Sequence, residues 1–186
     1  MSTRIDEFLP HYEFRAAYQV RINAPRPKVY ECLLRSDFAN LRLTRLLMAI
    51  RAGGRVPRHA APRGLLQRLD GTGFVVLKQL PDDEIVIGVA GRFWRPDGGR
   101  STELKRADFV TFSRTGFAKV AWNFKLLETA PRTEATILST DTRIQCFGQA
   151  TRWKFRAYWS VVGPFSGLIR KEMLRQVKIE AETEAG

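Results

Sequence analysis

Residues 152–182 carry the strongest structural signal in the chain, and they read RWKFRAYWSVVGPFSGLIRKEMLRQVKIEAE. Apolar side chains recur there at steps of three and four residues, which places them on one side of a helix predicted from Ala150 to Glu182. These side chains are Phe155, Tyr158, Trp159, Val162, Phe165, Ile169, Met173 and Val177. Burying this set contributes on the order of 10–20 kcal/mol as an upper estimate. A helix with so wide an apolar side needs an apolar surface to lie on.

Gly163-Pro164 falls inside this predicted helix. Proline removes one backbone hydrogen bond and clashes with the carbonyl of Ser160, which costs about 3 kcal/mol. The apolar stripe nevertheless keeps its phase from Val162 through Phe165 to Ile169. We therefore predict one kinked helix, bent to follow a curved sheet, rather than two separate helices.

The chain before this helix predicts the sheet that would supply the surface. Alternating apolar residues indicate a first strand within residues 12–23, and strand-like alternation returns after Gly73. Turn signals at 81–83 and 114–116 separate further predicted strands at Phe74–Leu80, Glu84–Trp94, Phe109–Ser113, Phe117–Glu128 and Glu134–Phe147. Strands in hairpin order, with helices before and after them, predict an α+β fold with an antiparallel sheet.

Helices are also expected between the first strand and Gly73. One follows Pro25, which suits a first helical turn, and a second begins at Asp37 or Asn40 and ends at Gly53-Gly54. Residues 53–72 are the most loop-like part of the chain, with a short helix around Leu65–Leu69. Residues 97–99, Asp-Gly-Gly, indicate a further turn or loop.

Length and composition predict a cytoplasmic protein of one domain. The 186 residues suit a single domain, 1–186, with a core of about 12–182, and 44% are hydrophobic. No apolar run approaches the length of a membrane span, and the first dozen residues lack the apolar segment of a secretory signal. Cys32 and Cys146 are isolated from each other and from the histidines, so we expect two buried, reduced thiols.

The net charge of +12 raises the question of whether the protein binds nucleic acid or an anionic membrane. Segment 42–68 holds seven arginines and no acidic residue. It lacks the interleaved aromatic residues that stack on bases, and the chain shows no nucleic-acid-binding motif, so nucleic acid is not favoured as a partner. Contact with an anionic membrane surface and a simply solvated basic face both remain open for this segment.

The order of these elements resembles the START-like superfamily, also called SRPBCC. The resemblance rests on the A-P-x-x-x-V entry at Ala24 to Val29, on FVVLKQLPDDEIVIGVAGRFW at 74–94, on Thr-Asp-Thr-Arg at 140–143 and on residues 158–174. It covers almost the whole chain and is nearest to bacterial members without an assigned function. The resemblance implies a helix-grip fold, in which a bent antiparallel sheet wraps around the terminal helix with a ligand cavity between them. It implies no universal catalytic residue, because the superfamily hosts many functions on one scaffold.

No motif of known catalytic chemistry appears in the sequence. His11 and His59 are the only histidines, both in loop-like or terminal stretches, and there is no catalytic triad. There is also no metal-binding motif and no phosphate-binding loop, so we expect neither a metal nor a cofactor. We expect a binding protein more readily than an enzyme.

The alternation of side chains between the two faces of a strand suggests which polar residues would reach a ligand. Threonine-rich faces often meet solvent, so we place Thr140 and Thr142 outside and expect Asp141 and Arg143 to point into the cavity. Arg143 would anchor a ligand carboxylate or phenolate, with Asp141 orienting it. The alternative is a structural or surface ion pair. The buried phenol of Tyr158 would be a further polar contact.

The aromatic residues would line the cavity or simply fill a core, and sequence does not separate the two. The complete set of expected ligand-binding residues is Phe93, Trp94, Phe112, Trp122, Phe124, Arg143, Phe155, Tyr158 and Trp159.

The function expected from these residues and from the resemblance is binding of a hydrophobic small molecule, as carrier or sensor. The ligand would be a lipid, a fatty acid or a polyketide-like aromatic compound. One alternative is a cyclase or dehydratase that uses Asp141, Arg143 and Tyr158 as catalytic residues. A second is a peripheral membrane lipid-transfer protein that uses segment 42–68. The sequence indicates neither the identity of the ligand nor the oligomeric state.

Overall fold

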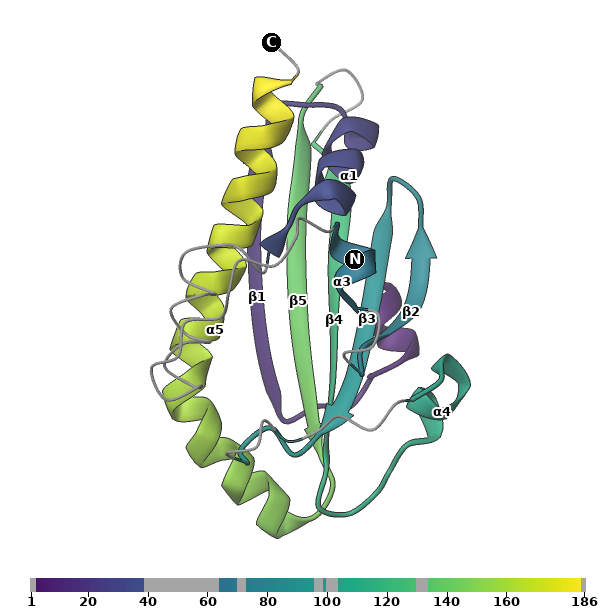
Figure 1. The fold of residues 1–186 in the computed structure, drawn as a ribbon, viewed down its shortest axis with the longest axis vertical. Coiled ribbons are helices and arrows are strands. Elements are labelled where there is room, and N and C mark those ends of the chain that lie inside the picture. Colours follow the sequence, from purple (N-terminus) through teal and green to yellow (C-terminus); the bar gives the residue numbers. More distant parts are fainter. Residues whose placement is uncertain are drawn as a thin grey trace.

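A computed structural model describes residues 3–38, 64–69, 73–95, 99, 104–129 and 134–184 (Figure 1). Their strands form one antiparallel sheet in the order β1-β5-β4-β3-β2. The strands are β1 (Phe14–Ile22), β2 (Val75–Leu80), β3 (Glu84–Gly91), β4 (Ala118–Glu128) and β5 (Thr136–Cys146). Every neighbouring pair except β1 and β5 is consecutive in the chain, so pairing between successive strands builds most of the sheet.

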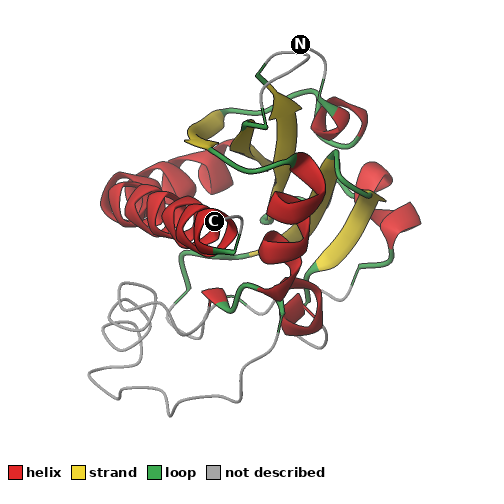
Figure 2. Ribbon diagram, turned by 90° about the horizontal axis from the view of Figure 1, so that it is seen from above, coloured by secondary structure: helices red, strands yellow, loops and turns green. Residues whose placement is uncertain are grey.

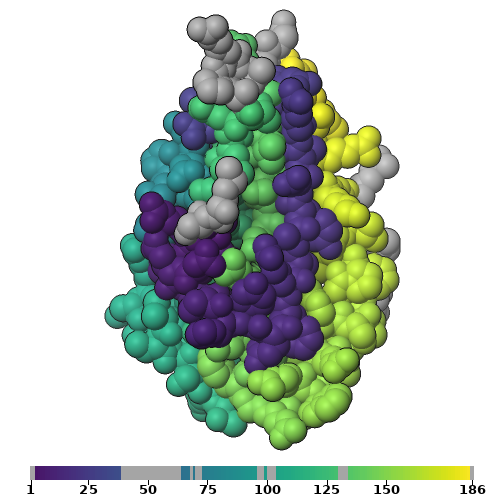
Figure 3. Space-filling view, turned by 180° about the vertical axis from the view of Figure 1, so that it is seen from behind, coloured from purple at the N-terminus to yellow at the C-terminus, as the bar shows by residue number. Residues whose placement is uncertain are grey.

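Helices cover both faces of this sheet. On the inner face, α5 (Gln149–Thr183) lies along β1 and β5, with α1 (Arg26–Arg35) beside it and α3 (Leu65–Leu69) near β2 (Figures 1 and 2). On the outer face, the 3-10 helix η1 (Arg4–Glu7) contacts β3 and β4, and α4 (Arg106–Thr111) contacts β2 and β3. Figure 3 looks onto the outer face, with the N-terminal segment in purple. The α+β, helix-grip architecture predicted from the sequence is confirmed.

The inward stripe of α5 explains why the helix lies on the sheet. Phe155, Met173, Leu174, Val177 and Ala181 are buried at the spacing of one helix side. Phe165, predicted to share this side, is 41% exposed, so that assignment is wrong. It follows Phe155 by ten residues, a rotation that carries it well off the buried side.

The terminal helix is continuous through Pro164, as predicted. Figure 1 shows it curved along its length, so that it follows the β1 side of the sheet. Close contact is possible at Gly167, because a Cβ atom there would run into the phenol of Tyr18 on β1.

The structure corrects one strand. Residues predicted as the strand Phe109–Ser113 lie in α4 and the turn after it, so the hairpin expected around 114–116 does not form. Phe109 is fully buried on the outer face, in a cluster with Leu77, Val86 and Ala121. Its ring lies over Gly88, where an added Cβ would stand 2.6 Å from Phe109 Cε2. Because the ring of Phe109 packs on the outer face of β3, the segment that carries Phe109 lies over the sheet and does not pair as one of its strands.

Other sequence expectations fall partly outside the described residues. The short helix at Leu65–Leu69 is confirmed, and Cys32 and Cys146 are buried and free. The second helix expected after residue 37 and most of segment 42–68 lie outside the described residues, as does the turn at 97–99 except for Gly99. Within the described part of the chain, no helix has the length and apolar character needed to cross a bilayer. The cytoplasmic location stays a prediction.

The contact between Gly88 and Phe109 predicts a strong coupling between two distant positions. Gly88→Ala should destabilise the protein by about 1–3 kcal/mol, because the new methyl group overpacks against the ring. In a Phe109→Ala background, which itself costs about 3–5 kcal/mol, the same change should cost less, with the contact of the new methyl group to Leu77 Cδ1 at 2.8 Å remaining. Denaturant unfolding of the four proteins measures this coupling, and additive effects would contradict the packing described.

Candidate functional site

The two charged residues expected to point toward the helix face the other way. Asp141 and Arg143 alternate along β5 with Leu138, which packs in one core cluster with Val177 of α5. Asp141 and Arg143 therefore lie on the outer face, and their predicted orientation into the cavity is wrong. The reason is a set of opposite charges supplied there by distant segments, which strand-by-strand sorting does not consider.

Arg143 is held by the N-terminal segment. Its guanidinium donates hydrogen bonds to Asp6 at 2.6 Å, to Asp141 at 3.2 Å and to the Leu9 carbonyl at 3.3 Å. Asp141 also accepts a hydrogen bond from Arg15 at 3.0 Å. With a residue exposure of 6%, Arg143 is a buried cation paired by carboxylates, which is the arrangement that makes such burial tolerable.

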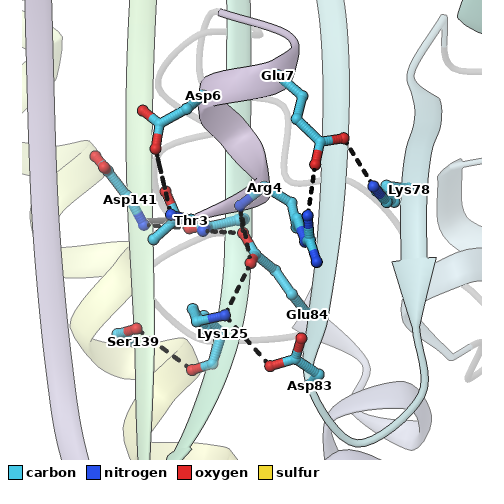
Figure 4. Close-up of polar contacts among 11 residues, drawn as sticks. Thr3, Arg4, Asp6, Glu7, Lys78, Asp83, Glu84, Lys125, Ser139 and Asp141 are labelled. Carbon is cyan, nitrogen blue, oxygen red and sulfur yellow. Dashed lines mark hydrogen bonds and ion pairs between the residues drawn. The ribbon is translucent and has the colours of Figure 1, made fainter. Parts of the chain in front are cut away.

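The same network continues across the outer face to Glu84, which is fully buried on β3 (Figure 4). Its carboxylate accepts hydrogen bonds from Asn123 at 2.7 Å, from the Arg4 backbone N–H at 3.1 Å and from Lys125 at 3.2 Å. Asn123 in turn accepts a hydrogen bond from the Asp141 backbone N–H at 2.8 Å. The carboxylates and cations of this outer network therefore satisfy one another through hydrogen bonds and ion pairs.

Lys119 is a second buried cation on the outer face. Its ammonium donates to the carbonyl groups of Phe109 and Val110 at 3.3 Å and of Phe112 at 3.4 Å. Burial lowers the pKa of this lysine. Because three carbonyl oxygens satisfy the three ammonium donors, this contact ties the end of α4 to β4.

On the inner face, by contrast, buried polar atoms lack partners. Among the described residues, the hydroxyl groups of Thr140 and Thr142 and the indole Nε1 of Trp122 have no hydrogen-bond partner, although these residues are only 1%, 5% and 7% exposed. Thr142 pairs with Trp122 across β5 and β4, and Thr140 pairs with Tyr18 across β5 and β1. The threonine-rich face, predicted to meet solvent, is therefore buried as well, and it is the face that meets α5. These three atoms are polar groups within an otherwise apolar surface.

Arg170 is a cation on α5 that lies near these polar groups. It is half-buried, and it lies three residues before Met173 and seven before Val177, along the buried side of α5. Its guanidinium carbon stands 5.0 Å from the centre of the Trp122 ring, and its Nη1 stands 3.7 Å from Met173 Sδ. Desolvation lowers the pKa of Arg170 to about 10, so the group stays charged at neutral pH. No carboxylate among the described residues forms an ion pair with it.

The candidate residues expected from the sequence do not include Arg170, Thr140 or Thr142. A signal for Arg170 exists, because it is a charged residue at the centre of an apolar helical stripe. A signal for the threonines exists as well. They alternate along the strand with Asp141 and Arg143, and a face that buried those two charges would have to supply ion-pair partners for them.

The predicted aromatic residues divide among three places. Phe155 is the centre of a cluster near the start of α5, with ring-centre distances of 5.7 Å to Tyr158 and Trp159 and 6.4 Å to Phe93 and Trp94. Trp122 and Phe124 belong to the main inner core, and Phe112 lies apart, against Phe117 and Phe147. Tyr158 is thus on the opposite side of the sheet from Asp141 and Arg143, so the three catalytic candidates do not meet.

The described residues line at least two hollows. One, of about 520 Å³, opens at the start of α5 and is lined by Trp94, Arg92, Lys154 and their neighbours. The other, of about 280 Å³, lies mainly on the outer face and is lined by Asp141, Arg15, Ser139 and residues around them.

The surroundings of the two cysteine thiols do not activate them as nucleophiles. Burial raises the pKa of Cys146 to about 12 and also raises that of Cys32, so neither thiol is activated. Within the described residues, histidine, cysteine and carboxylate side chains do not gather into a group that could hold a metal ion.

Comparisons with solved structures find distant similarity over nearly the whole chain. Protein CV1439 from Chromobacterium violaceum is 13% identical, with 91% of this chain and 99% of that chain covered and a TM-score of 0.37. TTHA0849 from Thermus thermophilus is 10% identical, with coverage of 93% and 100% and a TM-score of 0.35. The Zhui aromatase/cyclase from Streptomyces sp. R1128 is 12% identical, with coverage of 93% and 96% and a TM-score of 0.35.

No family model matches the sequence, and no curated protein matches it. At these identities and TM-scores, the similar structures carry no information about the activity of this chain.

The outer network predicts a pH-dependent contribution from Asp6. The hydrogen bond from Arg143 lowers the pKa of Asp6 below its ordinary value of 3.8, so this stabilisation is present above that value and is lost as the pH falls through the folded-state pKa. Asp6→Asn should cost less than about 1 kcal/mol at pH 7, because the carboxylate is partly exposed.

Urea unfolding of the wild type and Asp6→Asn between pH 7 and pH 2 measures the effect. The difference in unfolding free energy should shrink below pH 4. Asp108→Asn, an exposed carboxylate on α4 without an ion pair among the described residues, is the matched control. A difference that stays constant down to pH 2 would contradict the assigned ion pair.

Proposed function

We propose that the protein binds a hydrophobic small molecule between α5 and the inner face of the sheet, as a carrier or sensor. The observation that carries the proposal is the set of buried polar atoms without partners: Trp122 Nε1, Thr140 Oγ1 and Thr142 Oγ1. Leaving such atoms unpaired costs about 1–3 kcal/mol each, and folded proteins rarely retain them without a reason.

A ligand supplies that reason. Small-molecule sites are mostly apolar surfaces with a few convergent polar groups that orient the bound molecule. The inner face has this composition, because Phe124, Ile87 and Leu138 surround the unpaired atoms with buried apolar side chains. The contrast with the outer face supports the proposal further, since the buried ions there are already satisfied by protein groups.

Binding without catalysis is the simpler function for this arrangement. The three candidates for a cyclase or dehydratase, Asp141, Arg143 and Tyr158, lie on different sides of the sheet. The unpaired atoms of the strands on the inner face belong to hydroxyl and indole groups, which donate hydrogen bonds and do not take up a proton at neutral pH. Glu172 on α5 also has an oxygen without a partner, but it follows Arg170 by two residues, about 200° around the helix.

The direct test is native mass spectrometry of the protein purified from cells, together with titration of 4-(1-pyrenyl)butanol followed by energy transfer from tryptophan. The proposal expects an added mass of a small hydrophobic compound, or saturable binding of the pyrene alcohol. A protein with no added mass and no saturable binding would overturn it.

A threonine substitution should separate ligand binding from structural roles. Thr142→Val keeps the shape of the side chain and removes the unpaired hydroxyl, so the free protein should be as stable as the wild type or more stable by about 1 kcal/mol. Binding of the pyrene alcohol should weaken about 3- to 10-fold, because the ligand loses a hydrogen bond.

Thr136→Val is the matched control on the same strand and the same face. Its hydroxyl donates to the Ala24 carbonyl at 2.8 Å, so its loss should lower stability by about 1 kcal/mol and leave binding unchanged. If Thr142→Val destabilised the free protein like Thr136→Val, the unpaired hydroxyl would have a structural partner and the proposal would lose its main support.

A further inference from the structure

Arg170 lies on the inner face and forms no ion pair with a carboxylate in the part of the chain that the structure describes. A guanidinium that faces a protein interior is ordinarily paired with a carboxylate, as Arg143 is with Asp6 and Asp141. Among the described residues, the guanidinium of Arg170 contacts the ring of Trp122, at 5.0 Å, and the sulfur of Met173, at 3.7 Å. Neither contact carries a negative charge.

The position of Arg170 in the helix explains why the lack of a carboxylate partner matters. A fully exposed arginine on α5 would need no partner, because water would solvate it. Arg170 is instead half-buried on the side that buries Met173, Leu174 and Val177, and its partial removal from water lowers its pKa. The helix therefore holds a cation toward the sheet at a cost in stability that no described carboxylate offsets.

The unpaired groups near Arg170 share one chemical property. The guanidinium and the Trp122 indole N–H can only donate hydrogen bonds, and the hydroxyl groups of Thr140 and Thr142 can donate as well. Tyr18 belongs to the same inner face, and its phenol is a titratable neighbour of Arg170. A set of donors around one cation is complementary to an anion with several acceptor oxygens.

We infer that the ligand of the proposed site is a hydrophobic carboxylic acid, whose carboxylate is bound by Arg170 and hydrogen-bonded by the donors of the inner face. The inference rests on the proposed function and adds the chemical class of the ligand. The apolar part of the acid would lie on the aliphatic and aromatic side chains around Trp122. Arg170 is thus assigned the anchoring role that sequence analysis gave to Arg143.

The experiment compares two probes that differ only in the head group: 4-(1-pyrenyl)butanoic acid and 4-(1-pyrenyl)butanol. Energy transfer from tryptophan gives a Kd for each. The wild type should bind the acid about 10- to 100-fold more tightly than the alcohol, the range expected for charge-assisted hydrogen bonds. Arg170→Gln should abolish this preference by weakening the acid alone.

Arg175→Gln is the matched control, since Arg175 is an exposed arginine on the same helix. This variant should keep the preference for the acid. Arg170→Met is a second variant that removes the charge and keeps an apolar side chain. It should be at least as stable as the wild type, whereas an arginine with a purely structural role would leave a less stable protein when replaced.

The outcomes separate the two proposals. If the wild type binds both probes with equal affinity, the carboxylate assignment is overturned and the hydrophobic site stands. If Arg170→Gln or Arg170→Met keeps the wild-type preference for the acid, Arg170 is not the anchor and the inference is also overturned. If neither probe binds and the purified protein carries no added mass, the proposed function fails and the inference fails with it.

Discussion

The burial of the inward stripe of α5 on the sheet is the constraint on which the rest of the structure depends. A helix of 35 residues with large apolar side chains along one side has no stable place in water, and the inner face of β1 and β5 is the surface on which it lies. The contact of Gly167 with Tyr18 brings the helix close to β1. The position of α5 then determines which face of β1 and β5 meets the terminal helix.

The two faces of the sheet handle buried polarity in opposite ways. On the outer face, Glu84, Asn123, Asp141 and Arg143 form one connected network with the N-terminal segment, and each charge meets an opposite charge or a hydrogen-bond partner. On the inner face, neutral donors and the Arg170 cation have no hydrogen-bond acceptor or counter-ion among the described residues. A network that is complete contributes to a single fold, whereas one that is incomplete is suited to receive another molecule.

Sequence reasoning succeeded where one local signal was sufficient. The period of three and four residues identified α5, which continues through Pro164 although Phe165 leaves the buried side, and alternation identified the five strands that form the sheet. It failed at α4, because Phe109 looks like a strand residue until its packing over Gly88 is known. It also missed Arg170, since an apolar stripe is defined by its hydrophobic members and a charged residue within it is easily overlooked.

The sequence by itself determined that Thr140 and Thr142 share one face of β5 and that Asp141 and Arg143 share the other, because side chains alternate along a strand. Only the tertiary structure decided which of these faces meets α5. Both faces are covered, and the partners that pair with Arg143 and Asp141 come from residues 6 and 15, more than 120 positions away in the chain. Alternation relates residues within a strand, whereas the choice between faces depends on the charges that distant segments bring to each side.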